Sequence, residues 1–229
     1  MILLLRHGQT DWNLEPARCQ GWAGVPLNET GRAQARDQGR ALRGRGLELI
    51  VSSHLARAHE TAELVRDSLL EESAGDVVPA GAAGTKTGPQ PQDPLPLVVD
   101  PRLAETDRGG WEGRPFAEIV AAEPDAWRHY REHPGTFRFP GGESLAEQQL
   151  RVLACLRDVA LDGRRALLVT HGGSIRLARS FLGGRGMNAF DQDEAHNGAL
   201  AEVDPAGLAE RIERFLLETA QVRDARVGE

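Results

Sequence analysis

The amino-acid sequence predicts an α/β protein, a single-domain three-layer αβα sandwich with a mainly parallel central sheet. Short apolar runs alternate with longer segments of helical periodicity, as in strands joined by crossover helices. Several runs are continuously apolar, which is typical of strands buried on both faces. The chain has 229 residues, of which 40% are hydrophobic, enough to bury a large core without a disulfide or a metal. We therefore expect residues 1–229 to form one domain rather than two.

Five apolar runs are candidates for the strands. The first run meets Arg6 and His7 after only five residues, which is too short for a signal-peptide core or a membrane span. We therefore expect it to be a strand. The candidate strands cover residues 2–5, 49–51, 97–99, 166–169 and 199–203.

Capping residues and helical periodicity predict the helices between these strands. Thr30 is expected to cap a helix over about 31–43. Ser144 and Glu147 form an S-x-x-E capping box ahead of a segment with apolar residues at helical spacing. The remaining helices are expected at about 55–70, from 115 onwards, and at 125–132, 174–182 and 208–219.

Residues 74–96 interrupt this alternation. The stretch holds five prolines and four glycines and has few residues able to form a core. We expect a flexible surface insertion between a helix and a strand, with a lid over the functional site as the alternative.

Charge and cysteine content exclude several classes of protein. The chain has 27 basic and 34 acidic residues, a net charge of −7, and no basic run, so it is a poor candidate for nucleic-acid binding. No apolar run approaches the ~18 residues of a membrane span. Cys19 and Cys155 lie far apart without metal-ligand spacing, which favours a reduced, cytoplasmic compartment and predicts no metal site.

Two of the predicted strands end in the same way, in a histidine followed by a glycine. His7 follows the first strand directly after Arg6, and His171 follows the fourth. Ligands of open α/β sheets bind at the carboxyl ends of the strands, so both imidazoles face one crevice if these strands are neighbours. A lone histidine after a strand is more often structural, but the repeated context and the adjacent Arg6 favour a site.

Two further residues are expected at the same edge of the sheet. Arg57 lies in the first turn of the helix after the second strand, and Glu105 follows the third strand. The helix opening near Ser174 adds an N-terminal dipole suited to an anion. Two arginines, two histidines and one carboxylate form a dense cationic site, whose natural ligand is a phosphoryl group.

The segment 4–13, Leu-Leu-Arg-His-Gly-Gln-Thr-Asp-Trp-Asn, resembles the opening signature of the histidine phosphatase superfamily, the phosphoglycerate mutase-like proteins. The resemblance covers nearly the whole chain except 74–96 and the last twenty or so residues. It implies the phosphoglycerate mutase-like fold, a small phosphate ester as partner, and a homodimer as a family expectation. Further matches follow in the family's order at 20–31, 52–62, 102–105, 109–113, 140–144 and 171–173.

The resemblance also implies a role for each candidate residue. His7 is the nucleophile that forms a phosphohistidine, while Arg6, Arg57 and His171 hold the phosphoryl oxygens. Glu105 protonates the leaving alkoxide and later takes a proton from water. Because the first step needs the protonated carboxyl, we expect bound phosphoryl charge to raise its pKa. Contacts to the phosphate or substrate are implied for Asn13, Gln20, Gly21 and Gly172.

The segment that begins at Glu105 bears on the reaction. Cofactor-dependent mutases of the family read Glu-Arg-His-Tyr-Gly there, whereas this chain reads Glu-Thr-Asp-Arg-Gly, which is similar to the phosphatase branch. We therefore expect metal-independent hydrolysis of a small phosphate monoester, without a cofactor. A 2,3-bisphosphoglycerate-dependent phosphoglycerate mutase and a catalytically idle binder of a phosphorylated metabolite are the alternatives.

Two features leave the substrate open. His54 stands where the family usually has proline, so it is either a neutral replacement or a contact to substrate. Large aromatic residues either line the mouth of the site or pack in the core. These residues are Trp22, Trp111, Trp127, Phe137 and Phe139.

Overall fold

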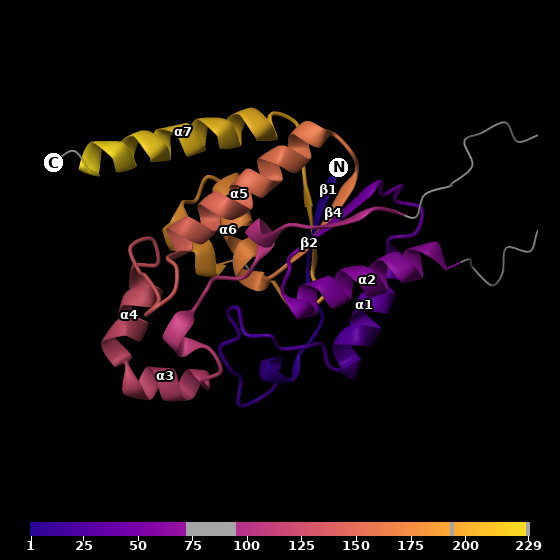
Figure 1. Cartoon of the computed structure of the whole chain (residues 1–229). Helices are drawn as coiled ribbons and strands as arrows, with labels where there is room; N and C mark the ends of the chain where they lie inside the picture. Colours follow the sequence, from indigo (N-terminus) through magenta and orange to yellow (C-terminus); the bar gives the residue numbers. More distant parts are fainter. Residues whose placement is uncertain (72–94, 193–194, 228–229) are drawn as a thin grey trace, which may run out of the picture.

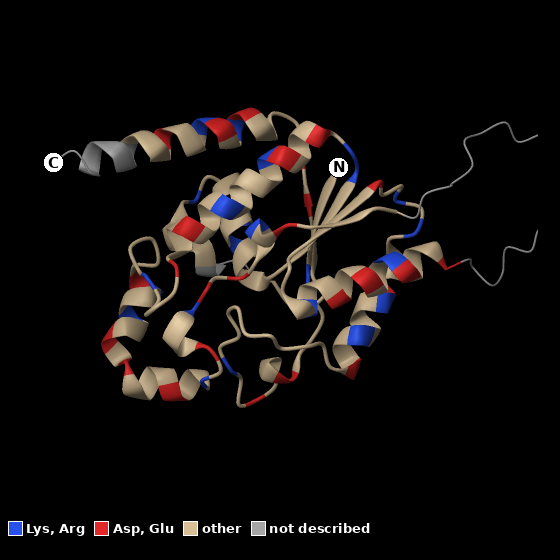
Figure 2. Ribbon diagram, viewed as in Figure 1, with Lys and Arg blue, Asp and Glu red and all other residues tan. Residues whose placement is uncertain are grey.

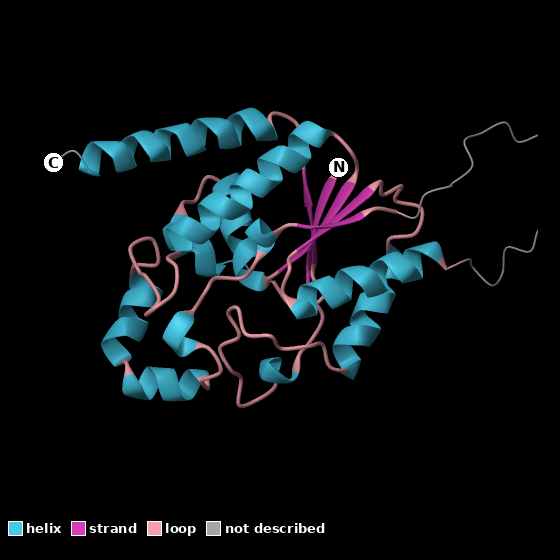
Figure 3. Cartoon of the chain, in the orientation of Figure 1, coloured by secondary structure: helices cyan, strands magenta, loops and turns pink. Residues whose placement is uncertain are grey.

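All five candidate runs form strands, and these strands assemble into one sheet in the order β3-β2-β4-β1-β5. The computed structural model describes residues 1–71, 95–192 and 195–227. Figure 3 shows the twisted sheet between helices, which confirms the predicted α/β class. The count of one domain over the whole chain stays a prediction. The strands are β1 (Ile2–Arg6), β2 (Leu49–Ser52), β3 (Leu97–Val99), β4 (Ala166–Thr170) and β5 (Leu200–Val203).

The sheet is mainly parallel, as the sequence predicts. Strands β1 to β4 run in the same direction, and only the edge strand β5 is antiparallel, to β1. The register pairs Arg6 of β1 with Thr170 of β4. The residues that follow these two strands, His7 and His171, therefore leave the sheet side by side.

Helices cover both faces of the sheet. Successive residues of a strand point to opposite faces, so each strand contributes apolar side chains to both helix layers. Leu3 and Leu5 belong to the apolar cluster beneath α1 (Glu29–Ala41) and α2 (Ala56–Leu70). Ile2 and Leu4 belong to the cluster on the other face. That cluster is formed with α5 (Leu145–Asp162), α6 (Gly172–Leu182) and α7 (Leu208–Val227), and Figure 1 shows the two helix layers on either side.

A third apolar cluster lies away from the sheet and is dominated by aromatic rings. It packs the short helices α3 (Phe116–Ala122) and α4 (Pro124–Glu132) around Trp111. Trp111 and Phe139 are fully buried and Phe137 is nearly so. These three aromatic residues therefore pack in the core and do not line the mouth of the site. Short 3-10 helices complete the chain: η1 (Asp11–Asn13), η2 (Pro101–Leu103), η3 (Gly109–Trp111) and η4 (Met187–Gln192).

Local signals place most helix ends correctly, but the starts of α1 and α6 need correction, and α7 continues to Val227, beyond the expected 219. The capping box of Ser144 and Glu147 forms at the start of α5 as expected. Helix α1, however, begins earlier than predicted, because the side chain of Asn28, not Thr30, accepts the Gly31 N–H at 2.9 Å. Helix α6 also begins two residues early, directly after His171. The predicted insertion at 74–96 lies outside the described residues except for its last two positions.

Acidic and basic residues are interspersed along the helices rather than separated onto different elements (Figure 2). Ion pairs within a helix, such as those of Arg32 with Glu29 and Arg40 with Asp37, account for part of this arrangement. None of the helices in the described ranges is long and apolar enough to cross a membrane.

Candidate active site

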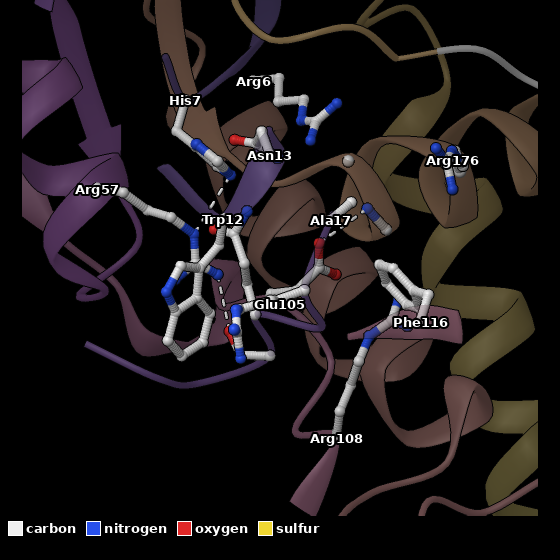
Figure 4. Close-up of a pocket in the computed structure, with 15 residues that line it drawn as sticks. Arg6, His7, Trp12, Asn13, Ala17, Arg57, Glu105, Arg108, Phe116 and Arg176 are labelled. Carbon is white, nitrogen blue, oxygen red and sulfur yellow. Dashed lines mark hydrogen bonds between the residues drawn. The ribbon is translucent and has the colours of Figure 1, made fainter. Parts of the chain in front are cut away.

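The carboxyl ends of the parallel strands border a cavity of about 210 Å³. Arg6, His7, Arg57 and Glu105 all line this cavity, so the structure brings together four of the five predicted catalytic residues in one space. Figure 4 shows their side chains converging from separate segments of the chain. The predicted residues thus lie together at this edge of the sheet, and their roles stay predictions.

His7 is held in one tautomer. Its Nδ1 lies 2.7 Å from the carbonyl oxygen of Gly8, which can only accept, so Nδ1 carries the proton. The other nitrogen, Nε2, accepts from Nε of Arg57 at 3.3 Å and therefore keeps its lone pair. Burial, and then the charges of Arg57 and Arg6, hold the pKa of His7 well below 6.5. The imidazole is neutral near pH 7, as a nucleophile requires.

The two arginines beside His7 are fixed by backbone carbonyls. The terminal nitrogens of Arg57 donate to Gly21 at 2.7 Å and to Ala23 at 3.1 Å. Arg6 donates to Ala195 at 2.5 Å. Burial lowers the pKa of both guanidinium groups to about 10, against the opposing effect of Glu105. Both remain charged at neutral pH and supply fixed positive charge to the cavity.

His171 lies next to His7 and is not among the residues that line the cavity. The two rings are 5.1 Å apart between centroids, and His171 is fully buried. Its Nε2 lies 2.9 Å from Oγ of Ser53, while Nδ1 has no hydrogen-bond partner among the described residues. Burial, followed by the charge of Arg57, holds the pKa of His171 well below 6.5. His171 is thus a neutral ring with one uncommitted nitrogen beside His7.

Glu105 accepts hydrogen bonds from two backbone N–H groups and a side-chain amide, with the hydroxyl of Thr106 at 3.5 Å. Its Oε1 accepts from the backbone of Thr106 at 3.0 Å and from Nε2 of Gln148 at 3.2 Å. Its Oε2 accepts from the backbone of Gly173 at 3.2 Å. A Cβ at position 173 would lie only 2.1 Å from Oε1, so the close approach requires glycine there. The Gly-Gly pair after His171 therefore serves this carboxylate as well as the cavity.

In the site without phosphate, the pKa of Glu105 is lowered, whereas the expected rise concerns the phosphate-bound site and stays a prediction. Burial alone would raise the pKa of this carboxyl. The charge of Arg108, the N–H groups of Thr106 and Gly173, and the charge of Arg57 outweigh burial and lower the pKa to about 2. Without phosphoryl charge in the cavity, Glu105 is ionised at neutral pH.

The residues predicted to contact substrate all line the cavity: Asn13, Gln20, Gly21 and Gly172. The side-chain oxygen of Asn13 accepts from the backbone and hydroxyl of Thr10, which leaves its amide nitrogen to donate elsewhere. The buried Oε1 of Gln20 has no hydrogen-bond partner in the part of the chain that the structure describes. Gly21 has a φ of 47°, a conformation that suits glycine.

Several residues that line the cavity were not predicted from the sequence. Arg18, Arg108 and Arg176 also line the cavity, together with Trp12 and Phe116. The signal for Arg108 was its place three residues after Glu105 in a glycine-containing loop. Gln148, whose amide donates to Glu105, was also not predicted. The sequence signal was a polar residue on the inner face of α5, where Gln148 is fully buried.

His54 does not line the cavity. Its ring packs edge-on against Trp22, 5.7 Å between centroids, and burial lowers its pKa. Trp22 in turn donates from Nε1 to the carbonyl of Glu105 at 2.7 Å. The histidine that replaces the family's usual proline therefore contacts the loop of Glu105 through Trp22.

A neutral histidine, one buried and one partly buried arginine, and a carboxylate in one cavity are typical of proteins that bind and transfer phosphoryl groups. The family model of the histidine phosphatase superfamily (branch 1) matches residues 2–74 and 82–217. The chain belongs to this superfamily, and the family resemblance of its motifs is confirmed.

Known relatives carry the names of both phosphatases and mutases. "Uncharacterized phosphatase PhoE" of Bacillus subtilis (strain 168) is 29% identical over 93% of each chain. "Probable phosphoglycerate mutase GpmB" of Enterobacter sp. (strain 638) is 31% identical, over 89% of this chain and 84% of the relative. Such relatives support a phosphatase-like or mutase-like enzyme without fixing the reaction.

Solved structures agree with the fold. Mycobacterial glucosyl-3-phosphoglycerate phosphatase, solved with VO3, is 29% identical with a TM-score of 0.69, over 87% of this chain and 90% of that chain. YhfR of Bacillus stearothermophilus is 30% identical with a TM-score of 0.71, over 89% and 91%. These neighbours confirm the phosphoglycerate mutase-like fold.

Proposed function

We propose that the protein is a metal-independent phosphatase that hydrolyses a small phosphate monoester through a phosphohistidine on His7. The observation that carries this proposal is the state of His7. Its Nδ1–H donates to Gly8, its Nε2 is unprotonated and faces Arg57, and burial holds its pKa well below 6.5. A purely structural or anion-binding histidine does not need an unprotonated nitrogen beside two arginines.

In the first step, Nε2 of His7 attacks phosphorus and the ester oxygen leaves. Arg6 and Arg57 stabilise the charge on the phosphoryl oxygens, and the amide nitrogen of Asn13 donates to the same group. When the hydroxyl of Ser53 donates to Nε2 of His171, Nδ1 of His171 carries a proton and adds a further donor. The two arginines supply the positive charge that a metal would otherwise provide, and Asn13 and His171 add neutral hydrogen-bond donors.

The proton for the leaving group arrives with the substrate. Glu105 is ionised in the free site because its pKa is about 2. A phosphate ester has a second pKa of about 6, so a singly protonated form is present near neutral pH. Once the phosphoryl charge offsets the arginines, the pKa of Glu105 rises and the proton passes from the phosphoryl oxygen to the carboxylate.

The second step regenerates the free histidine. After Glu105 has given its proton to the leaving alkoxide, the carboxylate accepts a proton from the attacking water. Water oxygen forms the new bond to phosphorus, the bond to Nε2 breaks, and inorganic phosphate leaves. One residue thus serves as acid and then as base.

The test is phosphate release from p-nitrophenyl phosphate in the presence of EDTA. His7→Ala removes the attacking atom, and we expect turnover to fall by at least about 1,000-fold, comparable to the loss of other activated nucleophiles. His129→Ala is the matched control, because His129 is exposed on α4 and does not line the cavity. Full activity in His7→Ala would refute the proposed function.

A phosphoglycerate mutase is the second candidate, because relatives more than 30% identical are named probable mutases. A mutase passes the phosphoryl group to a second substrate hydroxyl instead of water. Interconversion of 2- and 3-phosphoglycerate with 2,3-bisphosphoglycerate, at a rate above phosphate release, would establish this candidate. A preparation that binds phosphate esters but converts none would indicate the idle binder.

A further inference from the structure

Glu105 lies on a loop whose backbone is held by the side chain of one arginine. Arg151 projects from α5, 46 positions further along the chain. Its Nη1 donates to the carbonyl oxygens of Arg102 at 2.8 Å and Ala104 at 2.7 Å. Its Nη2 donates to the carbonyl oxygen of Glu105 itself at 2.7 Å. Three carbonyl groups of the segment 102–105 therefore converge on one guanidinium.

The remaining donors of Arg151 meet a carboxylate. Its Nε donates to Oε2 of Glu143 at 3.1 Å, and its Nη2 donates to Oε1 at 2.5 Å. An arginine has five N–H groups, so the loop accepts three of them and Glu143 the other two. The side chains of Arg151 and Glu143 are only 18% and 15% exposed, so little water competes for these hydrogen bonds. The guanidinium is therefore fixed in one orientation.

Glu143 extends this support to the far end of the same loop. Its Oε1 accepts from the backbone N–H of Asp107 at 2.9 Å, and its own N–H donates to the carbonyl of Asp107 at 3.0 Å. Arg151 and Glu143 together thus hold the backbone on both sides of Glu105. Glu143 also lies in the segment 140–144, a match to the family for which the proposed reaction gives no role.

The pair acts on the backbone of the loop and not on the cavity. Neither Arg151 nor Glu143 lines the cavity in the part of the chain that the structure describes. Residues 104–108 belong to no helix or strand, so the position of Glu105 depends on such external support. Proton transfer is sensitive to that position, because a displacement of about 1 Å can cost about 100-fold in rate.

We propose that Arg151 and Glu143 form a positioning pair that places Glu105 for proton transfer to the leaving group and from water. The inference rests on the proposed phosphatase function, in which Glu105 is the acid and then the base. Every hydrogen bond of the Arg151 guanidinium goes to the segment that ends in Glu105 or to Glu143. An ion pair that only joined two elements of the fold would not need this convergence on one loop.

The test compares two esters whose leaving groups differ in their need for an acid. p-Nitrophenolate leaves without protonation, whereas phenolate, the anion of a phenol with a pKa of about 10, leaves slowly unless an acid protonates it. The kcat/KM for phenyl phosphate, divided by that for p-nitrophenyl phosphate, therefore measures the contribution of Glu105 to the first step. We expect Arg151→Met to lower this ratio by about 100-fold relative to the wild type. Glu143→Gln should lower the ratio in the same direction.

An arginine of the same helix provides the matched control. Arg157 of α5 pairs with Glu213 of α7 at 2.6 Å, so Arg157→Met removes an ion pair without touching the loop of Glu105. Its ratio should equal that of the wild type. Arg151→Lys keeps the charge but has three donors in place of five, so the ratio should fall less than in Arg151→Met. Unchanged ratios in both Arg151 variants, or equal losses on both esters, would overturn the inference.

A second background shows whether the pair acts through Glu105. The acid is already absent in Glu105→Gln, so adding Arg151→Met should not lower kcat/KM for phenyl phosphate further. Two residues that act through one group are non-additive in this way. A further loss as large as that caused by Arg151→Met alone would assign Arg151 to the stability of the fold and overturn the inference.

A measurement without turnover keeps this inference distinct from the proposed function. Carbon NMR of protein labelled at the glutamate carboxyls follows the titration of Glu105 whether or not an ester is hydrolysed. A displaced loop takes this carboxylate away from Arg108 and from the N–H groups of Thr106 and Gly173, so its pKa should rise from about 2 in Arg151→Lys. Absence of turnover in the wild type would refute the proposed function alone. An unmoved titration in Arg151→Lys would overturn the positioning pair.

Discussion

Replacing Gln148 by methionine should change the acid–base behaviour of Glu105 without touching the cavity. Gln148 donates from Nε2 to Oε1 of Glu105 at 3.2 Å and accepts the hydroxyl of Thr106 at 2.5 Å. Methionine keeps the unbranched shape but removes the donor. A hydrogen bond to a charged group contributes about 1.5–3 kcal/mol. At about 1.4 kcal/mol per pH unit, its loss should raise the pKa of Glu105 by about 1–2 pH units.

Two measurements can detect this change in the pKa of Glu105. Carbon NMR of protein labelled at the glutamate carboxyls follows the titration of Glu105, identified by its disappearance in Glu105→Gln. The acid limb of kcat/KM for p-nitrophenyl phosphate should move to higher pH in Gln148→Met.

The neighbouring Gln149 provides the matched control. It is buried on the same helix, but its amide donates to the carbonyl of Leu177 at 3.2 Å and not to Glu105. Gln149→Met should destabilise the fold without moving the Glu105 titration. If Gln148→Met titrates like the wild type, or if Gln149→Met shifts equally, Gln148 has no specific role in holding the carboxylate.

Three further predictions concern pH, packing and metal. The folded-state pKa values of His7 and His171 lie well below 6.5, so the unfolded chain binds more protons below that pH and stability should fall on acidification. Denaturant unfolding between pH 7.5 and 5 measures how the free energy of unfolding depends on pH. His171→Asn should reduce this dependence by up to about 1.4 kcal/mol per pH unit. An unchanged dependence would show that burial does not lower the pKa of His171. Trp111→Ala should cost about 3–5 kcal/mol in the free energy of unfolding, against about 0.5 kcal/mol or less for the exposed Leu217→Ala, and similar losses would refute the aromatic core. Activity should survive dialysis against EDTA because arginines supply the positive charge, and recovery of lost activity by a divalent ion would show otherwise.

The edge of the sheet that holds the site could be predicted from sequence because the signals there are local. Continuous apolar runs mark buried strands, and residues directly after parallel strands meet at one edge. His7 and His171 satisfy both conditions, and the register of β1 with β4 brings them together. The capping box at Ser144 is equally local, since its hydrogen bonds span three residues.

Features that depend on distant neighbours were not predictable in this way. The role of Gln148 requires α5 to pack beside the loop after β3, a contact that spans 43 positions of sequence. The low pKa of Glu105 arises from Arg108, two backbone N–H groups and Arg57, which only the folded chain assembles. The burial of Trp111, likewise, follows from the packing of α3 and α4 around it.

The covalent intermediate is the central claim, and trapping it is the most direct test. Glu105→Gln cannot activate water, whereas p-nitrophenolate leaves without help from an acid, so this variant should accumulate phosphoenzyme. The reaction is quenched in alkali and the peptides are examined by mass spectrometry. We predict one phosphoryl group on the peptide that contains His7, preceded by a burst of p-nitrophenolate equal to the enzyme concentration. Turnover of the wild type without any phosphorylated peptide in the variant, or a phosphoryl group on another residue, would contradict the account.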